Sequence, residues 1–198
     1  MKQRILGIDP GTVVMGFGVV DRDGSALSLV DLGSVKFSAA KESVERLGDI
    51  LRAVEDLLDR YQPDAVAVEA PFFGKNVQSM LKLGRAQGVV LSAGLRRGLT
   101  VAEYPPAVVK RRISGRGAAS KEQLAGFLNA MFDIPIDPKR ALDATDALAV
   151  AACHALTVDR AAVLNHAISG SLTAKKKSSP RSSSWAKFLA QNPDRAAQ

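Results

Sequence analysis

Three things are scarce in this sequence of 198 residues. Its one cysteine, Cys153, excludes an intramolecular disulfide and a cysteine-based zinc cluster, which is typical of a reducing compartment. No apolar run approaches the roughly 18 residues that read as a membrane span. The N-terminal residues lead straight into an apolar segment, without the features of a signal peptide. We therefore expect a soluble, cytoplasmic protein with no membrane partner.

Acidic side chains are unevenly distributed. Residues 70–132 carry 10 basic and 2 acidic side chains, and residues 165–198 carry 6 and 1. Residues 1–69 and 133–164 are net acidic, so that the whole chain has a formal charge of +7. A basic surface beside an acidic site is what a nuclease needs, because phosphates must be attracted to a place that also holds cations.

Asp9 is the first candidate for chemistry, because it ends an apolar run and precedes a glycine turn. The segment Arg4–Ile8 is typical of a buried strand. Gly11, Gly16 and Gly18 allow the backbone to approach a phosphate or a neighbouring strand closely. Such a turn occurs in metal-dependent nucleases and in the phosphate-binding hairpin of the actin and sugar-kinase superfamily. A carboxylate that only caps a turn is the third interpretation.

Apolar periodicity and turn residues predict an α/β chain with one domain at residues 1–164. A basic, low-complexity tail, predicted to be disordered, follows at 165–198. The expected strands are Arg4–Asp9, about Val13–Val20, about Leu27–Phe37, Asp64–Glu69 and Leu99–Glu103; the expected helices are Val44–Tyr61, about Val77–Arg97, a short one with Lys110, one after the capping box Ser120–Gln123, and about Lys139–Val158. The hairpin turn at Arg22–Ser25 makes the first three strands antiparallel, and the next helix permits a parallel crossover.

Four carboxylates are candidate metal ligands. Glu69 ends the fourth expected strand as Asp9 ends the first, so parallel pairing of these strands would bring both to one sheet edge. Asp143 and Asp146 lie three residues apart, on the same face of the last expected helix. This helix is rich in alanine and expected to be buried, and a buried carboxylate pair needs cations. Solvated surface acids are the alternative for the helix pair.

Aromatic and basic residues of the middle segment are candidate DNA contacts. At least one phenylalanine of the loop after Glu69 is expected to be exposed and to stack on bases, with packing under the loop as the alternative. A glycine-rich loop before the helix that begins after Ser120 is a natural phosphate seat. Gly84 and Gly88, one turn apart, indicate close packing against another helix or a partner subunit. The candidate DNA contacts are Phe72, Phe73, Lys75, Asn76, Lys82, Arg85, Lys110, Arg111, Arg116 and Lys121.

Taken together, these motifs resemble those of the RuvC family, the bacterial Holliday junction resolvases, over about residues 3–158. The motifs that carry the resemblance are Gly7–Gly11, Val68-Glu69, Phe72–Asn76, Leu81–Gly84, Lys110, Lys121 and Asp143–Ala149. The resemblance implies a ribonuclease-H-like fold, with a five-stranded mixed sheet flanked by helices. It also implies a homodimer that binds four-way junction DNA and nicks two opposed strands of like polarity, with the RuvA and RuvB branch-migration proteins as partners.

The resemblance further implies roles for single residues. The family's four acidic ligands correspond to Asp9, Glu69, Asp143 and Asp146 here. Phe72 corresponds to the aromatic residue that contacts the junction, and the lysines that contact phosphates are Lys110 and Lys121.

Charge and ligand chemistry predict how such a site would work. Hard oxygen ligands favour Mg2+, with Mn2+ as a substitute. Two ions about 4 Å apart would activate a water and stabilise the leaving 3′ oxygen, which leaves 5′-phosphate and 3′-hydroxyl ends. Asp9 is expected to bridge the two ions and Lys121 to stabilise charge on the phosphate. These ends suit recombination and DNA repair, since a ligase can reseal them.

Two other functions use some of the same residues. A nuclease of the same fold that processes structured RNA would share the carboxylates, but the Phe72 loop and the lysine pair argue against it. An actin-like nucleotide-binding protein would use Asp9 and the turn after it for phosphate. That superfamily needs two such domains, and this chain has room for one.

Overall fold

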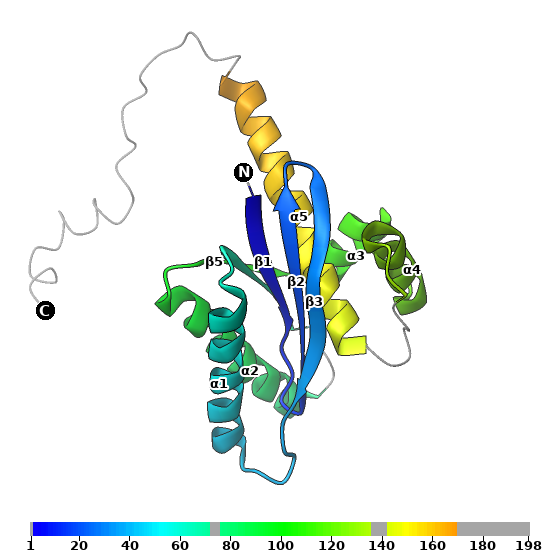
Figure 1. Cartoon of the computed structure of the whole chain (residues 1–198). Coiled ribbons are helices and arrows are strands. Elements are labelled where there is room, and N and C mark those ends of the chain that lie inside the picture. Colours follow the sequence, from blue (N-terminus) through cyan, green and yellow to red (C-terminus); the bar gives the residue numbers. More distant parts are fainter. Residues whose placement is uncertain (1, 72–75, 136–141, 170–198) are drawn as a thin grey trace, which may run out of the picture. The chain divides into compact units, whose positions relative to one another are not determined.

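The computed structural model describes residues 2–71, 76–135 and 142–169 (Figure 1). In chain order the strands are β1 (Lys2–Asp9), β2 (Val14–Asp23), β3 (Ala26–Lys36), β4 (Ala65–Glu69) and β5 (Thr100–Tyr104), and the helices are α1 (Ser43–Tyr61), α2 (Val77–Arg96), α3 (Pro106–Ser114), α4 (Lys121–Phe132) and α5 (Leu142–Ser169). The chain divides into two compact units, Met1–Ala162 and Val163–Gln198. The whole sheet belongs to the first unit.

The five strands form one mixed sheet in the order β3-β2-β1-β4-β5. The pairs β1–β2 and β2–β3 are antiparallel, whereas β1–β4 and β4–β5 are parallel. Asp23 pairs with Ala26 across the turn, where Gly24 has a φ of 60° that suits glycine. The predicted antiparallel meander, parallel crossover and five-stranded mixed sheet are confirmed.

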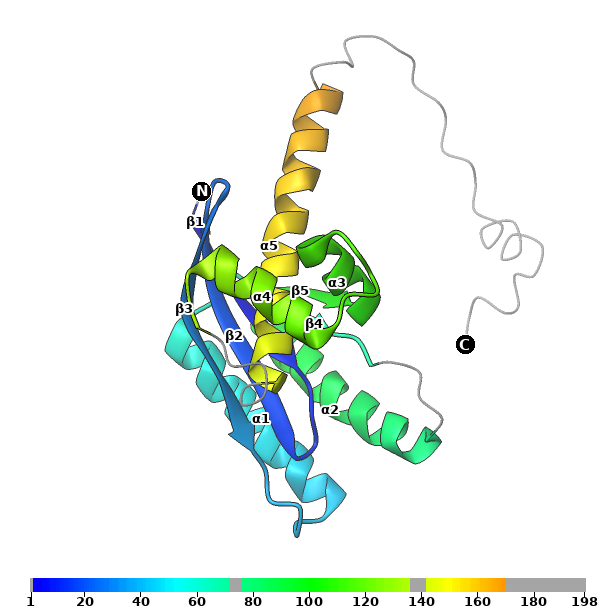
Figure 2. The ribbon, with the colours of Figure 1, turned by 90° about the vertical axis from the view of Figure 1, so that its right-hand side faces the viewer.

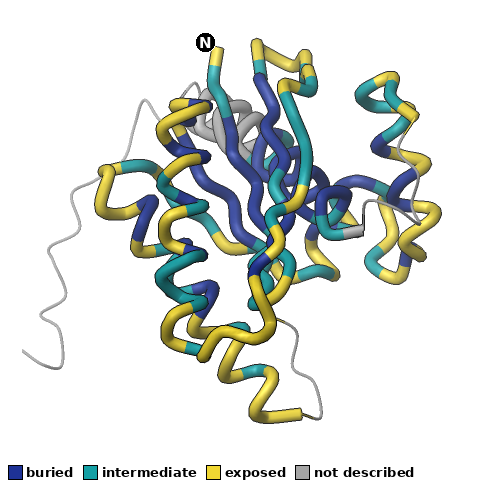
Figure 3. The backbone as a smooth tube through the Cα atoms, turned by 60° about the horizontal axis from the view of Figure 1, so that its bottom comes forward, coloured by how far each residue is buried: buried dark blue, intermediate teal, exposed yellow. Residues whose placement is uncertain are grey.

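Helices cover both faces of the sheet (Figure 2). On β1, Ile5 points into a core built with α3, α4 and α5, and Leu6 points into a second core built with α1 and α2. The same alternation holds for Ala65 and Val66 on β4. Figure 3 shows the buried residues along these central strands and the exposed ones on the outer helices. Strands buried on both faces explain the continuous apolar runs in the sequence.

Glycines in β1 and β2 let α5 pack directly on the sheet. A Cβ at Gly7 would overlap the Ala147 carbonyl oxygen, and one at Gly18 would lie 2.6 Å from the Leu148 Cα. The sequence predicted that Gly18 and Gly16 let the backbone approach a phosphate or a strand. The close neighbour of both glycines is instead the backbone of α5, which can approach because glycine has no Cβ atom.

The bounds of two elements differ from the prediction by more than two residues. Strand β2 extends past Val20 to Asp23, since the hairpin turn needs only two residues. Helix α5 begins at Leu142 and continues to Ser169, beyond the expected end at Val158. The added stretch contains no glycine or proline, so nothing in it breaks the helix. Residues 165–169 are therefore helical, and the rest of the predicted tail lies outside the described residues. No helix of the described part is both long and apolar enough to cross a membrane.

Candidate active site

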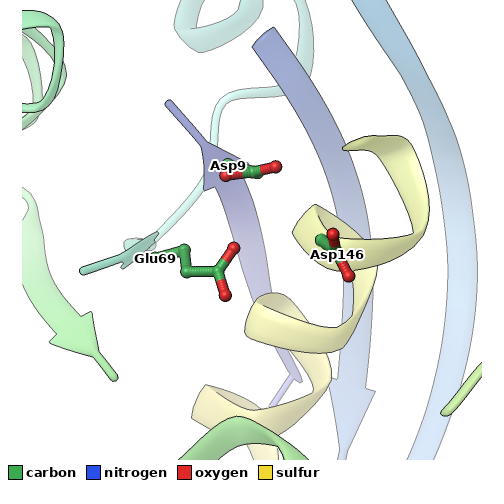
Figure 4. A group of neighbouring side chains, drawn as sticks. All are labelled: Asp9, Glu69 and Asp146. Carbon is green, nitrogen blue, oxygen red and sulfur yellow. The ribbon is translucent and has the colours of Figure 1, made fainter. Parts of the chain in front are cut away.

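Three carboxylates from distant parts of the sequence meet at one edge of the sheet. Asp9 is the last residue of β1, Glu69 is the last residue of β4, and Asp146 lies near the start of α5. Each has an oxygen within 4.8 Å of an oxygen of the other two. Figure 4 shows the three side chains facing a common space between the strand ends and the helix. The predicted meeting of the Asp9 and Glu69 carboxylates therefore occurs.

Local structure explains the meeting. In the parallel pairing of β1 and β4, Ile8 lies opposite Val68, so the next residues along both strands emerge together at the sheet edge. Asp146 directly precedes Ala147, the residue whose backbone contacts Gly7. The close packing of α5 on β1 thus brings the third carboxylate to the two strand ends.

Burial and mutual repulsion raise the pKa values of Asp9 and Glu69 in this group. Burial, followed by the charges of Glu69, Asp146 and Asp143 in that order of importance, raises the pKa of Asp9 to about 8. Burial and the charge of Asp146 also raise the pKa of Glu69. Ionising all of these carboxylates together is costly without a compensating positive charge. The group therefore offers oxygen donors of the kind that hold a divalent cation.

Asp143 lies close to the group but outside it. It is half-buried in the first turn of α5, and its charge contributes to the raised pKa of Asp9. Its backbone carbonyl faces Gly16 of β2, where a Cβ would overlap it. Its carboxylate is not one of the three that meet within 4.8 Å. The role of Asp143 as a fourth ligand stays a prediction.

Lys121 contacts one of the carboxylates directly. Its Nζ lies 2.7 Å from Oδ2 of Asp146, with side-chain exposures of 52% for the lysine and 18% for the aspartate. The hydrogen bond with Asp146 raises the pKa of Lys121 despite partial burial. Lys110 is half-buried in α3, and its charge lowers the pKa of Glu69. Lys121 therefore contacts the group of carboxylates directly, in a pairing with Asp146 that was not predicted, and Lys110 acts on Glu69 through its charge.

The other candidate DNA contacts are dispersed. Lys82 and Arg85 are exposed on α2, and Arg111 and Arg116 are exposed in α3 and after it. Asn76 is the N-cap of α2, where its side chain accepts a hydrogen bond at 3.1 Å from the Ser79 backbone N–H. An asparagine directly before a helix is a common N-cap, and the prediction of Asn76 as a DNA contact did not take this signal into account. Phe72, Phe73 and Lys75 lie outside the described residues, so their predicted contacts stay predictions.

The start of α4 is the predicted capping box. The Ser120 hydroxyl accepts a hydrogen bond at 3.2 Å from the Gln123 backbone N–H, and the Gln123 side chain accepts one from the Ser120 N–H. The same hydroxyl donates to the Glu122 carboxylate at 2.7 Å. These hydrogen bonds occupy the Ser120 hydroxyl and the backbone N–H groups of Ser120 and Gln123, which a bound phosphate would need as donors. The phosphate seat at this helix start stays a prediction.

Comparisons with known proteins agree with this geometry. A family model described as "Crossover junction endodeoxyribonuclease RuvC" matches residues 5–154. Relatives of that name include one from Christiangramia forsetii, 50% identical over 150 residues that cover 76% of this chain and 78% of the relative. Another, from Porphyromonas gingivalis, is 41% identical over 98% of this chain and 97% of its own.

Solved structures agree as well. Thermus thermophilus RuvC in complex with a Holliday junction substrate has a TM-score of 0.74 and 35% identity, over 80% of this chain and 96% of that one. The yeast mitochondrial Holliday junction resolvase Ydc2 has a TM-score of 0.63 at 13% identity, over 84% of each chain, and so supports the fold alone. The predicted ribonuclease-H-like architecture and the resemblance to the RuvC family are confirmed.

Proposed function

The chain belongs to the RuvC family of crossover junction endodeoxyribonucleases, and on this premise we propose that it resolves Holliday junctions in recombination and DNA repair. The observation that carries the proposal is the meeting of Asp9, Glu69 and Asp146 within 4.8 Å. A hydrolytic site of carboxylates and lysines fits a phosphodiester substrate, because it combines metal ligands with groups that attract phosphate.

The residues present fit divalent cations. Three carboxylates converge, and burial together with the neighbouring acidic charges raises the pKa of Asp9 to about 8; bound cations would offset the cost of ionising these acids together. Mg2+, or Mn2+ in its place, would supply an activated water and stabilisation of the leaving 3′ oxygen when bound. We assign Asp9, Glu69 and Asp146 as ligands, with Asp143 completing a set for two ions.

The lysines and the loop after β4 are assigned to DNA. Lys121 contacts Asp146 and the charge of Lys110 acts on Glu69, which supports their assignment to the scissile phosphate. Phe72 is assigned to the junction centre, where an aromatic ring can stack on an unpaired base. Exposed Lys82, Arg85, Arg111 and Arg116 extend the positive surface. Each nick is expected to leave a 5′ phosphate and a 3′ hydroxyl.

A homodimer supplies the two sites that paired nicks require. Helix α2 offers a face for it, because a Cβ at Gly84 or Gly88 would meet no atom within 4 Å. Nearby on the helix, Val77 is 65% exposed and Leu81 is 60% exposed. An apolar groove beside them is lined by Leu47, Leu51, Arg85, Gly88, Val89 and Ser92. Small residues at an exposed apolar face suit close helix contact with a second copy. RuvA and RuvB remain partners proposed from family membership.

The RNA-processing alternative receives no support from the comparisons. The similar relatives are named as crossover junction endodeoxyribonucleases, and the T. thermophilus structure contains a Holliday junction. We therefore propose junction DNA as the substrate.

A synthetic mobile four-way junction tests the proposal. We expect nicks in two opposed strands with Mg2+ and with Mn2+, and no cleavage of a structured RNA of similar size. Asp9→Asn is expected to abolish nicking and to leave junction binding largely intact. Asp23→Asn, at an exposed strand end away from the three carboxylates, is the matched control. Full nicking by Asp9→Asn would contradict the assignment of Asp9, and cleavage of the RNA alone would contradict the substrate.

A further inference from the structure

A positive side chain of the protein already contacts the proposed metal site. The Nζ of Lys121 lies 2.7 Å from Oδ2 of Asp146, which makes this a close ion pair. The lysine comes from the first turn of α4 and the aspartate from α5, so the pair joins two separate helices. The inference below deepens the proposed function and rests on it.

The ammonium acts on the whole group of acids. Asp146 has an oxygen within 4.8 Å of oxygens of Asp9 and Glu69. The charges of Asp9 and Glu69 also act on Lys121, in addition to the direct contact with Asp146. Lys121 thus supplies positive charge at the place where the proposed divalent ion would supply it.

Two cations at one carboxylate repel each other. A divalent ion on Asp146 and an ammonium on Oδ2 of the same residue would be a few ångströms apart, where repulsion in a partly buried site is large. The side chain of Lys121 is 52% exposed, so it has space to leave. Its backbone is held by the capping box of Ser120 and Gln123, so only the flexible side chain needs to move.

We propose that Lys121 is an internal counter-ion of Asp146, which a divalent ion displaces when it binds. Displacement frees the ammonium, still tethered beside the site, for the negative charge of a DNA phosphate. Metal loading and phosphate recognition are thereby coupled through one side chain, and the metal-free protein keeps its acids partly neutralised.

Mg2+ binding measured by calorimetry without DNA tests the proposal. Removal of the competing charge in Lys121→Met should tighten Mg2+ binding roughly tenfold, the scale of one close ion pair in a partly exposed site. Lys110→Met is the matched control, because Lys110 acts on Glu69 through its charge. We expect a clearly smaller gain from it. Lys121→Arg keeps the positive charge and should therefore lack the gain in Mg2+ affinity expected for Lys121→Met. Circular dichroism verifies that all variants are folded.

Each outcome has one meaning. Tighter binding by Lys121→Met alone supports the counter-ion role. Unchanged affinity would leave Lys121 as a phosphate contact only, and weaker affinity would make it a residue that orients Asp146; both overturn the inference without touching the proposed function. An equal gain in both lysine variants also overturns it, since loss of any nearby charge would then suffice. A wild-type chain that binds no Mg2+ overturns the proposed metal centre itself, and the inference with it.

Discussion

Gly7 of β1 lies so close to Ala147 of α5 that a Cβ on the glycine would overlap the alanine carbonyl oxygen. Asp9 follows Gly7 by two residues, and Asp146 directly precedes Ala147. The contact between two residues without catalytic groups therefore sets the distance between two of the three carboxylates. At this point of the molecule, the packing of α5 on β1 determines the geometry of the candidate site.

Gly7→Ala tests this relationship. The added methyl group meets helix backbone, which cannot rotate away, so we expect a loss of about 1–3 kcal/mol in the free energy of unfolding. Helix α5 must shift, so Mg2+ affinity should fall as well. Gly126→Ala in α4, where a Cβ meets nothing within 4 Å, should instead stabilise the protein by about 0.5–1 kcal/mol. Urea unfolding and calorimetry measure both; a Gly7→Ala protein with wild-type values would refute the packing argument.

Asp9→Asn should change how stability depends on pH in metal-free buffer. The pKa of Asp9 is about 8 in the fold against a usual value of 3.8. The folded state therefore holds its proton more tightly, and the wild type loses stability as pH rises from about 4 to about 8. The amide cannot ionise, so the melting temperature of the variant should exceed that of the wild type by several degrees at pH 8. The difference should shrink towards pH 4.

Thermal melts with a chelator present, at intervals between pH 4 and pH 8.5, give the measurement. Asp23→Asn, at an exposed position, controls for the loss of a charge. A pH-independent difference between Asp9→Asn and the wild type would contradict the raised pKa.

The ion pair between Arg4 and Asp21 joins β1 and β2 at the end of these strands that lies away from Asp9, and it should stabilise the sheet there. Arg4 Nε and Nη2 lie 2.7 and 2.9 Å from the two carboxylate oxygens. The hydrogen bond from Arg4 is the main cause of the lowered pKa of Asp21. Arg4→Met leaves the carboxylate, which is 10% exposed, with the more distant Lys2 Nζ at 3.5 Å. We expect a loss of about 1–2 kcal/mol at pH 7, because a mostly buried charge loses its partner.

The stability that this ion pair contributes should fall as the pH falls, whereas the stability linked to Asp9 falls as the pH rises. A lowered pKa means stability that is present above about pH 4 and disappears as the pH falls through the folded value. Arg4→Met and the wild type should therefore converge in acid, as measured by urea unfolding at pH 7 and pH 3. Arg52→Met, which breaks an exposed pair with Asp49, should cost less than about 0.5 kcal/mol. Equal costs for the two arginines would refute the prediction.

Gly88→Glu should disrupt the proposed homodimer. The residue lines the apolar groove beside α2, and a carboxylate placed between two copies would be buried without a partner. Sedimentation should show a dimer for the wild type and a monomer for the variant, with junction nicks no longer paired. Gly126→Glu, at an open position of α4, should remain dimeric. A dimeric Gly88→Glu protein would place the interface elsewhere.

Local rules were sufficient for most of the fold. A strand that ends in a carboxylate, a helix, and a second such strand imply a parallel crossover, and this brought Asp9 and Glu69 together without any knowledge of tertiary contacts. The capping box at Ser120 and the hairpin at Gly24 were equally readable, because their geometry depends on neighbours in sequence.

Contacts between distant helices were beyond such rules. The pairing of Lys121 with Asp146 depends on how α4 lies against α5, and the sequence pattern of neither helix encodes that placement. The sequence likewise offered no means of distinguishing Asp143 from Asp146, for a related reason. Two residues three apart share a helix face, but the tilt of α5 on the sheet decides which of them meets Asp9 and Glu69.

The order of the three acids along the chain has a consequence for synthesis. A ribosome makes residue 9 early, residue 69 midway and residue 146 late, and the last must also become part of a helix that rests on finished strands. A nascent or terminated chain that ends before residue 146 thus carries two acids of the trio at most. Such a fragment lacks at least one of the three carboxylates on which the proposed metal site depends.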